Sequence, residues 1–162
     1  MTPFFFTIVL HKTAKHASNL EDSLFEAGCS DALICRYNDT IYLEFDRNSP
    51  NAEMAISSAL DEIKQAGFTP ASIIEGGVAS MSEIASRAKL TRAAVNNYSK
   101  SVRGPGDFPE PLFGLASGSP LYSWPAVALW LHQQGKVDHS LVAVSQAAQQ
   151  LTPNLATTNH HR

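Results

Sequence analysis

Two adjacent glycines, Gly76 and Gly77, separate two parts of the 162-residue chain that differ in hydrophobic periodicity. Before them, strand-like apolar runs alternate with helical patterns, and directly after them the periodicity is helical. A chain of this length can hold one ordinary domain or two small ones, and the change of pattern favours two. We expect a first domain over residues 1–77, a second over residues 78–136, a C-terminal helix over residues 137–151 and a flexible tail over residues 152–162.

The first part reads as strand, helix, strand, strand, helix, strand. The strands are expected at residues 4–10, 32–37, 40–46 and 72–75, and the helices at residues 20–27 and 51–66. This order predicts an α+β fold that begins with a ferredoxin-like βαββαβ sandwich, in which both helices cover one face of an antiparallel sheet. The other face, which bears Tyr42 and Glu44, is expected to be free for a partner.

Positive charge is concentrated in the second part, although the whole chain has a net charge of −3. Residues 1–77 contain five Lys and Arg against eleven Asp and Glu, whereas residues 78–136 contain six against three. Five of those six lie between Arg87 and Arg103, with no acidic residue among them. A polyanion would therefore be attracted to the second part of the chain and repelled by the first.

Residues 82–101 fit the pattern of a helix-turn-helix, in which two short helices pack at a fixed angle and the second enters the DNA major groove. The helices are expected at residues 82–89 and 92–101. Lys89 occupies a position where Gly is frequent, because the backbone there favours a positive φ. The packing residues are Ala85 at the helix crossing, Leu90 in the turn, and Val95 and Tyr98 on the inner face of the second helix.

The residues after this motif resemble a known family. The segment Gly-Asp-Phe-Pro-Glu-Pro at 106–111, followed by Trp124, Val127, Trp130 and Leu131, resembles the AlpA and phage-excisionase branch of the MerR-like winged-helix proteins. The resemblance covers about residues 78–135 and implies a winged-helix domain that binds DNA. The wing it implies, residues 114–119, contains no Arg or Lys, so any wing contact would use backbone N–H groups or serine hydroxyls.

The same resemblance implies which side chains meet DNA. Base contacts are implied for Arg92, Ala93, Asn96 and Asn97, and phosphate contacts for Ser82, Thr91, Lys100 and Arg103. Arg can bond guanine at two points and Asn can bond adenine in the same way. Arg87 and Lys89 complete the predicted DNA-binding residues, because they add positive charge beside the motif. We expect Phe108, Trp124 and Trp130 to pack in the core of the domain rather than to stack on bases.

These patterns predict a sequence-specific regulator of transcription that binds double-stranded DNA, needs no cofactor and is not an enzyme. The alternative is an antitoxin or adaptor whose first domain binds a protein partner, with DNA binding for autoregulation. We expect a homodimer, because two copies double the phosphate contacts and read two half-sites. The dimer could use the free face or an edge of the sheet, or the last helix; that helix could equally pack on its own domain.

Other function classes find little support. The apolar start of the chain lacks the basic residues and cleavage site of a signal peptide, and no stretch approaches the length of a membrane span, so we expect a cytoplasmic protein. Cys29 and Cys35 lack the paired spacing of a zinc site and are expected to be buried thiols. The histidines at 11, 16, 132 and 139 are expected to be solvated, and the pair at 160 and 161 is assigned no role.

Overall fold

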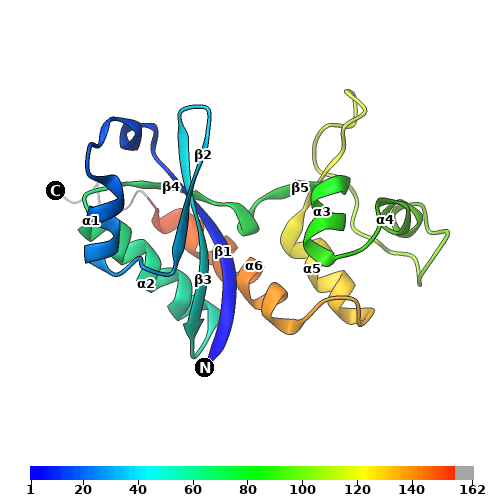
Figure 1. Ribbon diagram of the computed structural model, residues 1–162. Coiled ribbons are helices and arrows are strands. Elements are labelled where there is room, and N and C mark those ends of the chain that lie inside the picture. The colour runs from blue at the N-terminus through cyan, green and yellow to red at the C-terminus, as the bar shows by residue number, and fades with distance from the viewer. Residues whose placement is uncertain (156–162) are drawn as a thin grey trace.

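The strands of the first part form one antiparallel sheet with the order β2-β3-β1-β4. Figure 1 shows the computed structural model, which describes residues 1–155; His160 and His161 lie outside the described residues. The elements of this part are β1 (Thr2–Leu10), α1 (Leu20–Ala27), β2 (Ala32–Tyr37), β3 (Thr40–Ser49), α2 (Ala52–Gln65) and β4 (Pro70–Ile73). The described residues contain six α-helices in all, and the predicted α+β class is confirmed.

Alternate side chains of the sheet point in opposite directions and create one covered face and one open face. The covered face shares an apolar cluster with α1 and α2 and contains Phe4, Phe6, Ile8, Leu10, Ile41, Leu43 and Phe45. On the open face Glu44 is exposed and Tyr42 is half-buried, as the alternation in the sequence predicts. Phe5 and Leu33 are 61% and 63% exposed there, so the open face is apolar as well as charged.

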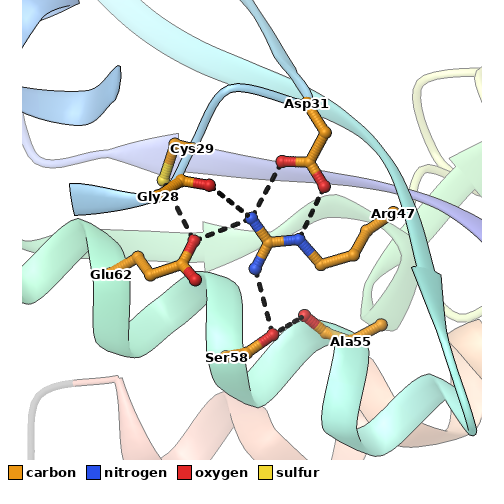
Figure 2. A network of polar contacts seen from close by, with 7 residues as sticks. All are labelled: Gly28, Cys29, Asp31, Arg47, Ala55, Ser58 and Glu62. Atoms are coloured by element: carbon orange, nitrogen blue, oxygen red, sulfur yellow. Dashed lines mark hydrogen bonds and ion pairs between the residues drawn. The ribbon is translucent and has the colours of Figure 1, made fainter. Parts of the chain in front are cut away.

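β3 continues to Ser49 rather than ending at residue 46, because its inward positions change from apolar to polar. Arg47 points inward and is only 7% exposed. Its Nε and Nη2 donate to the Asp31 carboxylate at 2.7 and 2.8 Å, and Nη2 also donates to Glu62 at 2.7 Å (Figure 2). Its Nη1 donates to Ser58 Oγ at 3.0 Å. Hydrogen bonding to Asp31 raises the pKa of Arg47, so this buried cation keeps its charge and its partners.

The two cysteines lie in different environments. Cys29 is buried, with its Sγ 3.7 Å from Glu62 Oε1, and burial raises the pKa of its thiol to about 12. Cys35 is half-buried on the open face, the same face as Leu33, on the edge strand β2. The prediction of a buried thiol is therefore confirmed for Cys29 and wrong for Cys35.

β4 ends at Ile73, two residues before the end predicted from the sequence, and a 3-10 turn (Ile74–Gly76) follows. The reason is a side chain that replaces backbone pairing. The carboxylate of Glu75 accepts hydrogen bonds from Thr7 N at 2.8 Å and Thr7 Oγ1 at 3.0 Å. The glycine pair therefore belongs to the end of an anchored turn rather than to a free linker.

The second part contains a small two-stranded sheet, of which the sequence predicts the strand at residues 121–124 but not its partner. Its strand β5 pairs antiparallel with β6, and three residues are too few for a periodic signal. The elements are β5 (Val78–Ser80), α3 (Met81–Ala88), α4 (Arg92–Ser99), β6 (Leu121–Ser123), α5 (Trp124–Gln133) and α6 (His139–Leu151). None of the helices within residues 1–155 has the length and apolar content needed to cross a bilayer.

The last helix, α6, connects the two parts of the molecule (Figure 1). Val144, Ala147 and Ala148 belong to the apolar cluster of the first part, whereas Val142 belongs to that of the second. The chain then continues through a 3-10 turn (Thr152–Asn154) to Leu155, which is 6% exposed in the first cluster. The apolar stripe of α6 is thus used inside the chain. Of the predicted flexible tail, residues 152–155 pack on the first cluster through Leu155, and residues 156–162 lie outside the described residues.

Gly76 is the point of closest approach between the joint and α6. A Cβ added at Gly76 would lie 2.8 Å from the carbonyl carbon of Ala148 and 2.8 Å from the backbone nitrogen of Gln149. We therefore expect Gly76→Ala to lower the free energy of unfolding by about 1–3 kcal/mol, because neither backbone can move away without unpacking α6. Thermal or urea denaturation measures the change.

The neighbouring glycine provides a matched control. A Cβ at Gly77 would meet only Ile74 O at 3.5 Å, and its φ of −105° is not in the left-handed region. Gly77→Ala should unfold like the parent protein. Equal loss of stability in both variants would contradict the close packing of α6 on Gly76.

Candidate nucleic-acid interface

α3 begins with a reciprocal pair of capping hydrogen bonds. Ser80 Oγ accepts from Glu83 N at 3.2 Å, and the Glu83 carboxylate accepts from Ser80 N at 2.8 Å. The cap is therefore Ser80. Ser82 is left exposed on the first turn of the helix, where its Oγ accepts a hydrogen bond from Arg92 Nη1 at 2.9 Å.

The turn between α3 and α4 has the left-handed backbone expected from the sequence. Lys89 adopts φ 57° and ψ 42°, and Leu90 N donates to Ala85 O at 2.9 Å. Leu90 is half-buried and packs against the apolar cluster of the second part. A lysine thus holds a conformation that costs a non-glycine residue about 1–2 kcal/mol.

α4 starts at a threonine cap and stops earlier than the sequence pattern predicts. Thr91 Oγ1 accepts from Ala94 N at 3.0 Å. The helix ends at Ser99, and Ser101 then adopts a φ of 60°, which no α-helix continues through. The backbone carbonyl of Asn97 accepts from Val102 N at 2.9 Å and so closes the C-terminal turn.

The inner face of α4 packs as predicted. Val95 is completely buried and Tyr98 is 4% exposed, in one cluster with Ile84 and Ala85 of α3. The ring of Tyr98 meets that of Trp130 edge-on, with centroids 5.2 Å apart. The core therefore fixes which face of α4 points outward.

The aromatic residues of the family-like segment are core residues, as predicted. Phe108, Trp124 and Trp130 are 8%, 1% and 5% exposed. Phe108 contacts both Tyr122 and Trp130 edge-on. The indole nitrogen of Trp130 donates to Asp107 Oδ1 at 2.8 Å, which ties the Gly-Asp-Phe segment to α5.

The outer face of α4 is open to solvent. Most of the predicted contact residues are exposed, namely Ser82, Thr91, Arg92, Ala93, Lys100 and Arg103, and Asn96 and Asn97 are half-buried. The guanidinium carbon of Arg103 lies 5.9 Å from the Tyr98 ring centroid, so this side chain rests on the end of the helix. Figure 1 shows α4 at the end of the molecule away from the front sheet, so the acidic first part does not cover this face.

Arg87 does not belong to this face. Its guanidinium carbon lies 5.1 Å from the Trp124 ring centroid, and its Nη1 is shielded from solvent. Arg87 and Lys89 both line a cavity between the two parts of the chain. The structure therefore does not bring Arg87 together with the other predicted DNA-binding residues: it lies on α3 at a helical position that turns toward α5 and α6. The number of charged residues in a segment does not show in which direction each side chain points from its helix.

Residues 112–121 form a small hairpin at the predicted wing. Phe113 bridges Leu121, and Ser119 N donates to Gly114 O at 3.0 Å. A Cβ at Gly114 would lie 1.9 Å from Ser119 O, so only glycine fits this turn. Phe113 and Leu115 are 60% and 67% exposed, which gives the hairpin an apolar surface in place of a charged one.

No match to this chain is found among protein-family models, curated proteins or solved structures. The family resemblance therefore rests on the motif residues quoted above. Within residues 1–155, no group of three His, Cys, Asp or Glu side chains is placed to hold a metal ion.

The left-handed turn residue gives a direct test of this geometry. We expect Lys89→Gly to unfold with a free energy about 1 kcal/mol higher than Lys89→Ala, because glycine adopts a positive φ without the steric cost. The alanine variant is the matched control, since it removes the same charge and side chain while keeping a Cβ. Denaturant titration of both variants measures the difference, and an alanine variant as stable as the glycine variant would contradict the left-handed turn.

Proposed function

We propose that this chain is a sequence-specific regulator of transcription that binds double-stranded DNA with α4. In this proposal the second part is a winged helix-turn-helix, with α3 and α4 as the helix pair and residues 112–121 as the wing. The strand order β2-β3-β1-β4, with α1 and α2 on one face, supports a ferredoxin-like arrangement for the first part. The observation that carries the functional proposal is the outward, uncovered face of α4.

The dimensions and chemistry of α4 suit a DNA groove. An eight-residue helix is about 12 Å long, similar to the width of the major groove of B-DNA. Arg92 and Asn96 are four residues apart and share one side of the helix, as do Ala93 and Asn97. Arg and Asn are the side chains that bond guanine and adenine at two points, so this face can read sequence.

The surrounding residues suit phosphate binding. Lys100 and Arg103 are exposed beyond the end of α4, and Ser82 and Thr91 present hydroxyls at the starts of α3 and α4. In the free protein Ser82 holds the Arg92 guanidinium at 2.9 Å, which orients this side chain before DNA arrives. Phosphate contacts of this kind set the register of a protein on the duplex without reading sequence.

Substitutions on α4 separate base reading from charge attraction. Arg92→Ala and Asn96→Ala should each lose about 1–3 kcal/mol of discrimination between a selected site and its single-base variants. Lys100→Ala should weaken binding to all sequences alike and reduce the salt dependence by about one phosphate contact. Mobility-shift titrations measure both effects, on DNA selected from random sequences with the full chain.

The matched control is Lys12→Ala, which removes an exposed lysine from the acidic first part. It should bind the selected DNA like the parent. Variants of Arg92, Asn96 and Lys100 that also bind like the parent would rule out α4 as the DNA-reading helix.

We further propose a homodimer formed by the open face of the front sheet. α6 uses its apolar stripe within the chain, whereas Leu33 and Tyr37 of β2 remain exposed on that face. The same face would serve the protein partner of the antitoxin or adaptor alternative, which a pull-down with the full chain would detect.

Size-exclusion chromatography with light scattering tests the dimer. The parent should elute with twice the mass of one chain, and Leu33→Asp should shift it to one chain by placing a charge within the apolar contact. Met54→Asp is the control, because Met54 is 52% exposed on α2, away from the open face. A parent protein that stays monomeric at high concentration would contradict the proposal.

A further inference from the structure

A cavity of about 580 Å³ lies where the first and second parts of the chain meet. β1 contributes Phe5 and the joint contributes Glu75, whereas Arg87 comes from α3 and Trp124 from α5. Residues of α6, including Leu141, complete the lining. This volume falls within the range of about 300–1,000 Å³ that is usual for sites of small organic ligands.

Arg87 is a cation at the wall of this cavity to which no described residue presents a hydrogen-bond acceptor. Its guanidinium lies over the Trp124 ring, with 5.1 Å between carbon and centroid, and it makes no hydrogen bond or ion pair with any residue in the described range 1–155. Arg47 is the opposite case, because Asp31, Ser58 and Glu62 satisfy its donors. A partly buried guanidinium without a partner is unfavourable, and a carboxylate is the group that satisfies it best.

No carboxylate around the cavity forms an ion pair with Arg87 among the described residues. Glu75 accepts two hydrogen bonds from Thr7; burial raises the pKa of its carboxyl, and the charge of Arg87 partly opposes this shift. Lys89 and Lys136 add positive charge and Asp138 adds negative charge, all three on exposed side chains. The cavity therefore favours an anion.

Most of the remaining lining is apolar. Phe5, Trp124, Leu141 and Val144 surround the space beside Arg87. Arg87 is the half-buried cation of the lining, whereas Lys89 and Lys136 are exposed, so the site suits one negative charge on an apolar body.

We propose that this cavity binds a small organic carboxylate, with the carboxylate on Arg87 and an aromatic or aliphatic body against Phe5, Trp124 and Leu141. The site also offers a route to regulation, a step that rests on the proposed DNA-binding function. Arg87 and Ala88 end α3, and Lys89 forms the turn that positions α4. A ligand that favours one arrangement of this turn would change the affinity of α4 for DNA.

Binding can be tested on the full chain without DNA, using 2-naphthoate and its neutral analogue 2-naphthamide as probes. Isothermal titration calorimetry should show naphthoate binding at least about 10-fold tighter than naphthamide, because only the anion can pair with Arg87. Arg87→Gln should remove this preference and leave naphthamide binding unchanged. Arg103→Gln, which alters an exposed arginine beside Tyr98, should leave both affinities unchanged.

Phe5→Ala is a second test variant. It leaves the core around α3 intact, because Phe5 lies on β1 and is 61% exposed. It should weaken both probes by a similar factor. The proposal is overturned by naphthoate that fails to bind at millimolar concentration, by equal affinity for the two probes, or by an anion preference that survives Arg87→Gln. These results leave DNA binding untouched, so the two proposals fail separately; a mobility-shift titration with added naphthoate then measures the coupling.

Discussion

The packing of α6 against Gly76 is the contact on which the arrangement of the two parts depends. α6 contributes apolar side chains to both clusters, and the absence of a side chain at Gly76 lets its backbone come close to the joint at Ala148. Glu75 anchors the same joint to β1 through Thr7. Because β5 starts directly after this joint, the position of α3 is tied to that of the front sheet.

Because of this connection, the proposed DNA-binding face and the proposed ligand site lie on different sides of the second part. The core that contains Val95 and Tyr98 turns one face of α4 outward, away from the front sheet. The end of α3 turns the other way, so that Arg87 faces the cavity beside α6. The turn at Lys89 lies between the proposed DNA-reading helix and the proposed ligand site, which makes it the place where the two could communicate.

The sequence was most informative where one periodicity runs through a whole element. It predicted the βαββαβ order, the inward positions of α4 and the unusual backbone of Lys89, since each depends on local spacing or turn chemistry. It misplaced the end of β3, because Arg47 is buried by distant Asp31 and Glu62 rather than by an apolar pattern. It could not show where Arg87 points or which elements cover α6. An apolar helix face predicts that the face is buried, but not which part of the chain packs against it.

The central claim is that the outer face of α4 meets DNA, and an NMR titration of the labelled full chain with its selected duplex tests this most directly. We predict that backbone amide signals from Thr91 to Arg103 and that of Ser82 shift most, whereas those of β2 stay in place. Shifts confined to the front sheet, with the signals of α4 unchanged at saturation, would contradict the account.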